Sequence, residues 1–190
     1  MIKKIAILFV ALLLGTSSLY AAAAQETTNK GVEYVKSGKY DEAIAEFTKD
    51  VALDPQDADA YNNRGIAYLA RLSSERVGQK DLKKIVADFD SANADFNKAI
   101  KLKPDFAAAY YNRGLTNIAQ YEKAIVDFSR TIALKPDNAR AYYYRAVEYF
   151  NIKEYSQSWA DVRKAQKMGY EVDPNFLKKL ESKAAGVTKK

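Results

Sequence analysis

The sequence predicts an all-α fold built from repeated helix-turn-helix pairs. The chain of 190 residues is 48% hydrophobic but has only 8 Gly and 4 Pro, fewer turn residues than an all-β fold normally uses. A phrase of the form Tyr-x-x-Arg followed by a small residue recurs along the chain, and a phrase of the form Ala-x-x-acid-Phe alternates with it. Such an internal repeat favours an α-solenoid of about four stacked helix pairs, closed by a C-terminal capping helix.

Residues 1–24 have the pattern of a Sec export signal. Lys3 and Lys4 supply the basic start, an apolar run extends from Ile5 to Leu14, and Ala22-Ala23-Ala24 provides a small-residue cleavage site. An uncleaved membrane anchor is the alternative, but the apolar run is shorter than the roughly 20 residues that span a bilayer. We therefore expect cleavage near Ala24, a periplasmic or secreted product, and no stable membrane insertion afterwards.

The two phrases mark the first and second helices of each pair. The first reads Tyr61-Asn-Asn-Arg64-Gly65, Tyr110-Tyr-Asn-Arg113-Gly114 and Tyr142-Tyr-Tyr-Arg145-Ala146, and the second extends over Ala43–Phe47, Ala92–Phe96 and Ala124–Phe128. Each Phe lies four residues after an Ala, on the same helical face, where it can fill the seam between helices. The small residues allow the paired helices to approach closely, and Pro55, Pro104 and Pro136 end the pairs.

These residues resemble the tetratricopeptide repeat, whose units of about 34 residues combine small, aromatic and proline positions in this order. The resemblance implies a right-handed α-solenoid over residues 25–186. We expect repeats at about 26–57, 58–106, 107–138 and 139–170, a capping helix over 173–185 and a disordered tail over 187–190. Asp173-Pro174 is expected to start the capping helix, because Asp is a favoured N-cap and Pro a favoured first helical residue.

The second repeat departs from the standard length. Tyr61 and Tyr110 are 49 residues apart, which predicts an insertion near 71–88 and a second helix that begins near Asp81. Residues 71–84 of this insertion contain two acids, Glu75 and Asp81, and five cations, namely Arg71, Arg76, Lys80, Lys83 and Lys84. Its tip is therefore expected to be basic, either as a solvated face or, through Arg76, Lys80, Lys83 and Lys84, as an accessory contact for an acidic partner.

Composition removes most enzyme chemistry from consideration. The chain has no Cys and no His, so it offers no thiol nucleophile, imidazole base, disulfide frame or Cys/His metal site. We predict no catalytic residues, no cofactor and no metal. The net charge of +6 is not arranged as a basic stripe with interleaved aromatic residues, so nucleic acid is not an expected partner.

The resemblance also implies a concave groove, lined by the first helices of successive repeats, in which extended peptides or partner helices bind. The residues expected to line it are Asn62, Asn63, Tyr111, Asn112, Arg140, Tyr143 and Tyr144. Asn can pair with a peptide backbone, and Tyr supplies a flat surface with a polar tip. The alternative is that the amides are merely solvated and that Tyr143 and Tyr144 pack against the capping helix.

One binding mode of the family grips a peptide's C-terminal carboxylate with Asn and basic residues from successive repeats. Asn112 and Arg140 match two of these positions. Val32 or Ile66 stands where an Asn is needed, and Tyr144 stands where a cation is needed. We therefore expect this grip to be incomplete.

The recurring Arg64, Arg113 and Arg145 are interpreted as structural. The second helices carry an acid at one repeated position, as Glu46, Asp95, Asp127 and Asp161. Pairing between these two columns would tie the helices of a repeat together.

The expected function is that of a non-catalytic interaction module or scaffold that binds a peptide or partner helix in its groove. One alternative is a self-assembling structural subunit, which would form homo-oligomers. Another is an accessory protein that binds cell-wall glycan by stacking on Tyr111, Tyr143 and Tyr144.

Overall fold

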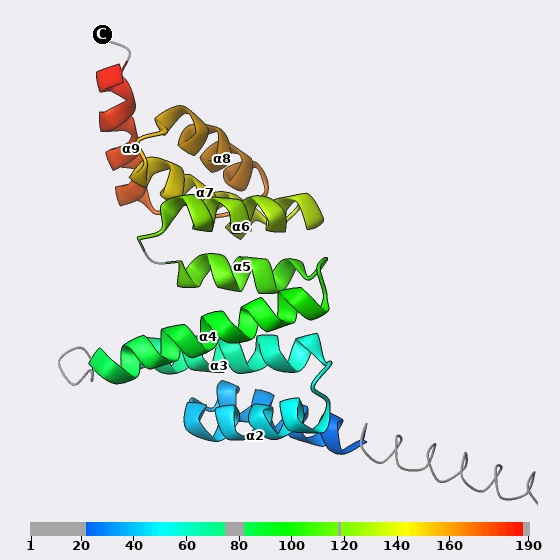
Figure 1. Cartoon of the computed structure of the whole chain (residues 1–190). Coiled ribbons are helices and arrows are strands. Elements are labelled where there is room, and N and C mark those ends of the chain that lie inside the picture. Colours follow the sequence, from blue (N-terminus) through cyan, green and yellow to red (C-terminus); the bar gives the residue numbers. More distant parts are fainter. Residues whose placement is uncertain (1–21, 75–81, 118, 188–190) are drawn as a thin grey trace, which may run out of the picture. The chain divides into compact units, whose positions relative to one another are not determined.

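A computed structural model describes residues 22–74, 82–117 and 119–187, and within these ranges the chain is helical without strands (Figure 1). The helices are one over 22–36, α2 (Tyr40–Leu53), α3 (Ala58–Ser74), α4 (Leu82–Leu102), α5 (Ala107–Thr116), α6 (Tyr121–Leu134), α7 (Ala139–Asn151), α8 (Tyr155–Lys167) and α9 (Pro174–Val187). The predicted all-α repeat fold with a C-terminal helix is confirmed. The export signal as far as residue 21 lies outside the described residues.

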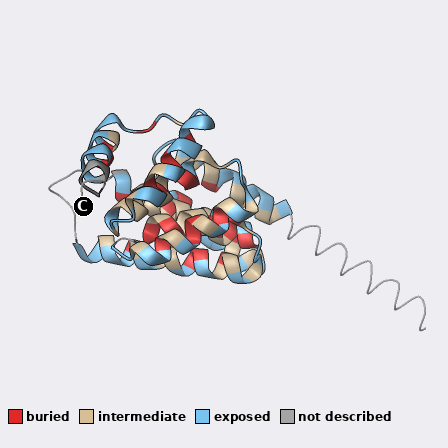
Figure 2. Cartoon of the chain, turned by 90° about the horizontal axis from the view of Figure 1, so that it is seen from above, coloured by how far each residue is buried: buried red, intermediate tan, exposed pale blue. Residues whose placement is uncertain are grey.

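The helices form two compact units, which are described separately. The N-terminal unit ends at Leu102 and contains the helix over 22–36 with α2, α3 and α4, and the C-terminal unit begins at Lys103 and contains α5 to α9. Within each unit, helices that follow one another in the chain pack together. In Figure 2 the buried residues lie on the faces that neighbouring helices turn toward one another.

The glycine of each repeat makes room for the phenylalanine of the paired helix. A Cβ atom added to Gly31, Gly65 or Gly114 would lie only 2.5, 2.6 or 2.7 Å from Cε1 of Phe47, Phe96 or Phe128. These three rings are at most 1% exposed. In the fourth repeat Ala146 and Val162 share one buried cluster. Ala, which is larger than Gly, is thus paired with Val, which is smaller than Phe.

The last helix closes the C-terminal unit. Asp173 Oδ1 accepts a hydrogen bond from the Asn175 backbone N–H at 2.9 Å, as expected for a residue that starts a helix. Phe176 and Leu180 then enter the buried cluster around Ala146 and Val162. α9 extends to Val187, the residue at which the disordered tail was predicted to begin.

The enlarged second repeat appears as two long helices, because α3 has 17 residues and α4 has 21. Arg71 corrects one sequence prediction about this region. Its side chain is 16% exposed, its Nε donates to Asp88 Oδ2 of α4 at 2.9 Å, and it also pairs with Asp41 of α2. Arg71 therefore links three helices instead of contributing to a basic tip, because α4 places a buried acid opposite it.

Candidate functional site

Four tyrosine rings meet in the C-terminal unit, and we refer to them as the tyrosine cluster. Tyr111 comes from α5, Tyr143 and Tyr144 come from α7, and Tyr170 comes from the segment between α8 and α9. The ring centroids are 6.0 Å apart for Tyr111 and Tyr144, 5.3 Å for Tyr143 and Tyr144, and 5.0 Å for Tyr143 and Tyr170. All four residues are half-buried, so each ring is held by neighbours and still reaches the surface.

Buried phenylalanine rings pack against the tyrosine cluster. The Phe128 ring of α6 lies 5.8 Å from the Tyr111 ring and 5.9 Å from the Tyr144 ring. The Phe176 ring of α9 lies 5.8 Å from the Tyr143 ring at an interplanar angle of 85°. The alternative that Tyr143 packs against the capping helix is therefore confirmed, although Tyr143 keeps part of its surface exposed.

The environment raises the pKa of three phenol groups of the cluster, those of Tyr111, Tyr143 and Tyr170. Burial, together with the nearby Tyr144, raises the pKa of Tyr111 to about 12, while the positive charge of Arg140 acts in the opposite direction. Burial likewise raises the pKa of Tyr143 and of Tyr170, and Arg140 again opposes the shift at Tyr170. These three tyrosines thus present neutral hydroxyl groups near the exposed guanidinium of Arg140, which suits hydrogen bonding to peptide groups and to a carboxylate.

The structure brings together four of the predicted site residues, namely Tyr111, Arg140, Tyr143 and Tyr144. Asn112 lies on α5 beside Tyr111 and is half-buried. Sequence reasoning missed Tyr170, because it follows α8 and does not occupy either of the two positions after a leading Tyr that supplied the other tyrosines. Its aromatic type, just before the predicted capping helix, was the only signal available.

The predicted pair Asn62 and Asn63 lies on α3 of the N-terminal unit. Asn63 is half-buried, but Asn62 is only 5% exposed. The prediction that both amides face a groove is therefore wrong for Asn62. The physical reason is that α3 packs against both α2 and α4, so more of its circumference is covered than one partner helix would cover.

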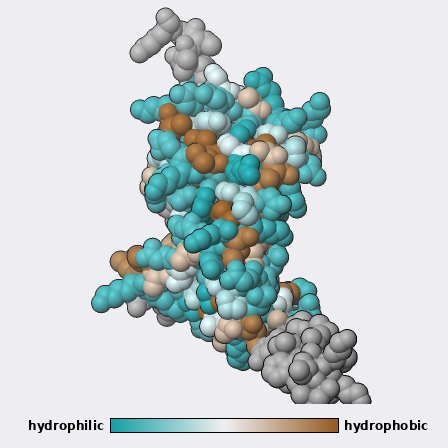
Figure 3. Space-filling view, turned by 45° about the vertical axis from the view of Figure 1, so that its right-hand side comes forward, coloured by the Kyte–Doolittle hydropathy of each residue, from teal (hydrophilic) through white to brown (hydrophobic). Residues whose placement is uncertain are grey.

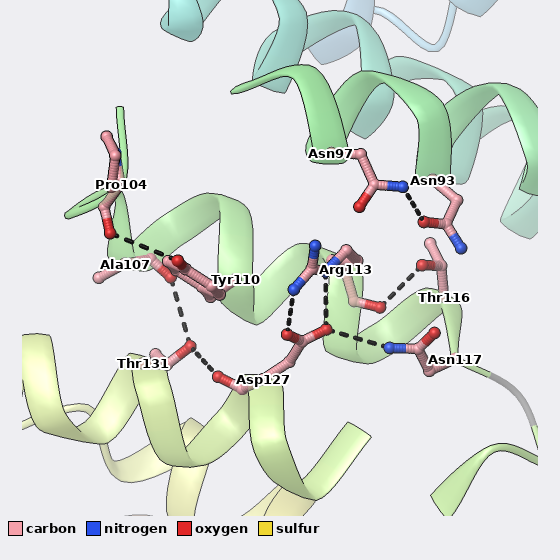
Figure 4. Close-up of polar contacts among 10 residues, drawn as sticks. All are labelled: Asn93, Asn97, Pro104, Ala107, Tyr110, Arg113, Thr116, Asn117, Asp127 and Thr131. Carbon is pink, nitrogen blue, oxygen red and sulfur yellow. Dashed lines mark hydrogen bonds and ion pairs between the residues drawn. The ribbon is translucent and has the colours of Figure 1, made fainter. Parts of the chain in front are cut away.

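The repeated arginines are structural, as predicted. Two nitrogens of each guanidinium contact both oxygens of one carboxylate, at 2.7 and 2.8 Å for Arg64–Asp95, 2.6 and 2.9 Å for Arg113–Asp127, and 2.7 and 2.8 Å for Arg145–Asp161. The Asn117 amide also donates to Asp127 at 3.0 Å (Figure 4). In the first repeat Glu46 pairs instead with Lys49 of its own helix at 2.6 Å.

The tyrosine that leads each phrase belongs to the same structural arrangement. The guanidinium carbon lies 5.7 Å from the ring centroid for Arg64 and Tyr61, 5.5 Å for Arg113 and Tyr110, and 5.6 Å for Arg145 and Tyr142. Each arginine is thus held between a ring and a carboxylate. The phrase Tyr-x-x-Arg recurs because it joins the two helices of a repeat.

The predicted basic hairpin is described only in part. Lys83 and Lys84 are exposed near the start of α4, whereas Arg76 and Lys80 lie outside the described residues. No three His, Cys, Asp or Glu side chains in the described ranges are placed to hold a metal ion. None of the helices that the structure describes combines the length and apolarity needed to cross a membrane.

Comparisons with known proteins agree with the repeat. Residues 31–70 and 88–120 match the family model described as TPR repeat. A stretch of 63 residues, 33% of this chain, is 38% identical to Hsp70-Hsp90 organizing protein 1 of Glycine max, and it covers only 11% of that protein's length. The chain thus corresponds to a small part of that relative.

Two solved structures resemble a larger part of the chain. The crystal structure of MamA has a TM-score of 0.64 and 25% identity, and the similarity covers 77% of this chain and 78% of that chain. The first TPR of Spaghetti (RPAP3), bound to the HSP90 peptide SRMEEVD, has a TM-score of 0.59 and 29% identity, with 70% of this chain and 94% of that chain covered. The matched segments are therefore similar to tetratricopeptide repeats, and the all-α repeat fold of the described chain is like that of these proteins.

Proposed function

We propose that this chain is a non-catalytic protein-interaction module whose C-terminal unit binds an extended peptide or a helix of a partner protein. The observation that carries the proposal is the tyrosine cluster, in which partly exposed rings rest on buried phenylalanines beside the exposed Arg140. Tyrosine and arginine are enriched among the residues that dominate protein interfaces. The peptide complex of the Spaghetti TPR, which has a similar fold, supports the same general role.

The packing of the rings favours binding at low entropic cost. Tyr144 stacks on Phe128 at an interplanar angle of 24°, and Tyr143 is held between Tyr170 and Phe176. Side chains that are ordered before binding lose little rotamer freedom when a ligand arrives. The cluster is therefore suited to hold an apolar side chain of a peptide, while Arg140 pairs with a neighbouring acidic side chain.

The same geometry argues against recognition of a C-terminal carboxylate as the main source of affinity. Tyr144 occupies a position where that mode needs a cation, and its ring is engaged with Phe128, Tyr111 and Tyr143. The only exposed cation of the expected set in the C-terminal unit is then Arg140. We expect the peptide SRMEEVD and its C-terminal amide to bind this protein with similar, weak affinity in an anisotropy titration.

The test uses peptides selected from a displayed random library with residues 25–190, and their affinities are measured by fluorescence anisotropy. We expect Arg140→Ala to weaken the selected peptides by about tenfold, because a hydrogen bond to a charged group contributes about 1.5 kcal/mol or more. Tyr144→Phe, which removes only a hydroxyl, should weaken them by a smaller factor. The matched control is Arg163→Ala, which removes an exposed cation from α8 of the same unit. Selected peptides whose affinity is unchanged in both Arg140→Ala and Tyr144→Phe would refute the proposal.

Glycan binding by the same tyrosines is a weaker candidate. The Tyr111–Tyr144 and Tyr143–Tyr144 pairs meet at 70° and 65°, so ring edges cover part of the flat faces on which a sugar would stack. Titration with purified glycan strands distinguishes the two ligands. Saturable binding to glycan that is lost in Tyr144→Ala would favour the glycan instead of the peptide.

A further inference from the structure

The end of the N-terminal unit formed by α3 and α4 exposes apolar surface. Leu82 is 75% exposed and Val86 is 58% exposed, one helical turn apart on α4. Beside them an open pocket of about 280 Å³ is lined by Leu69, Leu72, Ser73, Ile85 and Phe89. We call the pocket together with Leu82 and Val86 the hairpin patch. α3 and α4 extend past α2 at this end (Figure 1), and Figure 3 shows apolar surface there.

Among the residues that the structure describes, the charge next to the hairpin patch is positive. Lys83 and Lys84 are both exposed, and the first turn of α4 contains no acidic residue. The next acid of α4, Asp88, is buried and holds Arg71. An approaching surface therefore meets apolar groups that share the first turns of α4 with two exposed lysines, which favours a partner that carries carboxylates.

The pocket and the neighbouring lysines distinguish three candidate partners, namely a second copy of the chain, a lipid surface and a helix of another protein. A second copy in a two-fold arrangement would place Lys83 and Lys84 of both copies in one interface, and like charges oppose that contact. A lipid surface would cover Leu82 and Val86, but it would leave the concave pocket behind them without a side chain to fill it. A helix with one apolar face fills the pocket and covers the exposed residues at the same time.

We propose that the hairpin patch docks an acidic amphipathic helix of a partner protein. One apolar side chain of that helix enters the pocket between α3 and α4, and the next lies on Leu82 and Val86. Its flanking carboxylates pair with Lys83 and Lys84. This surface belongs to the N-terminal unit and shares no residue with the tyrosine cluster, so it stands whether or not the peptide-binding proposal does.

The test uses a short synthetic amphipathic helix as the probe, with Leu at helical spacing on one face and Glu on its flanks, and a twin with Lys in place of each Glu. Binding to residues 25–190 is followed by fluorescence anisotropy. We expect the Glu peptide to bind at least about tenfold more tightly than its twin. Leu82→Ser combined with Val86→Ser should weaken the Glu peptide by about tenfold, because the apolar contact is lost. Lys83→Glu combined with Lys84→Glu should reverse the preference between the two peptides.

Two control variants make the test specific. Val126→Ser replaces an apolar residue that is 65% exposed on α6, and it should leave the Glu peptide's affinity unchanged. Arg140→Ala should also leave it unchanged, which separates this surface from the tyrosine cluster. All substituted positions are exposed, and circular dichroism of each variant checks the fold.

Several results would overturn the proposal. Equal affinity for the Glu peptide and its twin would show that Lys83 and Lys84 do not select an acidic partner. If Val126→Ser weakened the Glu peptide as much as Leu82→Ser/Val86→Ser does, binding would not be specific to the hairpin patch. Binding to phosphatidylglycerol vesicles that is lost in the Leu82→Ser/Val86→Ser variant, without binding of the Glu peptide, would assign the patch to a lipid surface. Dimerisation that is lost in the same variant, again without peptide binding, would assign it to a second copy of the chain.

Discussion

At the scale of single residues, the chain depends on charges that are buried in pairs. Arg145 and Asp161 have side chains that are 18% and 8% exposed, and they contact each other at two points. Both members of such a pair have lost most of their contact with water. Loss of one member therefore leaves the other buried without its partner. Removing only one of them therefore lowers the free energy of unfolding much more than replacing both.

We predict that Arg145→Met lowers the free energy of unfolding by about 3 kcal/mol, because it leaves the Asp161 carboxylate buried without its partner. The double variant Arg145→Met/Asp161→Leu should recover most of this loss, since no unpaired charge remains. Urea denaturation of the three proteins measures both effects. A single variant that loses less than about 1 kcal/mol would show that the pair is solvated.

A second buried charge lacks such a partner. Asp50 of α2 is 0% exposed, its Oδ2 accepts a hydrogen bond from the Thr28 hydroxyl, and its Oδ1 has no hydrogen-bond partner among the described residues. Thr27, the other nearby hydroxyl, donates to the Ala24 carbonyl at 2.8 Å. Burial accordingly raises the pKa of Asp50 above its ordinary value.

Asp50 is therefore predicted to weaken the fold at neutral pH. Because its pKa is higher in the folded than in the unfolded chain, its contribution to stability is fully present below the unfolded pKa of about 3.9, and it is lost as pH rises through the folded pKa. Asp50→Asn should be more stable than the parent at neutral pH, with the advantage shrinking as pH falls toward about 4. Urea unfolding across this pH range measures the difference, and parallel pH profiles for the two proteins would contradict the prediction.

At the scale of helices, the fit between a small residue and a large one sets how closely each pair packs. Gly65 is buried on α3, where an added Cβ would lie 2.6 Å from Cε1 of Phe96 on α4. The fourth repeat uses the opposite combination, with Ala146 and Val162 both 0% exposed. Substitutions at Gly65 and Phe96 are therefore expected to have coupled effects on the free energy of unfolding, because the interior has no spare space at either position.

We predict that Gly65→Ala destabilises the protein by about 1 to 3 kcal/mol, since the overpacking exceeds the roughly 0.5–1 kcal/mol that Ala gains over Gly within a helix. Phe96→Val should also destabilise it, by about 2 kcal/mol, through the cavity that it leaves. The double variant should lose at least about 1 kcal/mol less than the sum of the single losses. Denaturant melts of the four proteins complete this cycle, and strict additivity would contradict direct contact.

At the scale of the whole molecule, the N-terminal sequence predicts where the protein is found. The pattern over residues 1–24 indicates export, and the described helix over 22–36 includes the last three residues of that segment. We predict that the exported protein begins at Gln25. Mass spectrometry of the intact protein from a bacterial periplasmic fraction gives the N-terminus directly.

A substitution provides the matching control for export. Ala24→Arg should abolish processing, because the cleavage site requires small residues, whereas Ala45→Arg changes an exposed alanine of α2 and should not affect it. A full-length chain as the main exported species, or the same N-terminus in both variants, would contradict the assignment.

The sequence by itself determined the order of helices, the seams between them and the Arg–Asp columns. These features depend on residues three or four positions apart, or on positions that recur from repeat to repeat, so they can be read along the chain. The Asp173 cap was predictable for the same reason, because a helix start depends on its own first residues. Three of the four rings of the tyrosine cluster were likewise found from the two positions that follow the leading Tyr of each repeat.

Only the tertiary structure decided which of these side chains are available to a partner. In the folded chain Asn62 is buried, whereas Leu82 and Val86 are exposed. Arg71 forms ion pairs with Asp88 and Asp41, and the Tyr170 ring packs against Tyr143. Each outcome depends on what packs against a face of a helix and not on the helix itself. Helical spacing identifies the face on which a residue lies, but the neighbouring helix determines whether that face is covered.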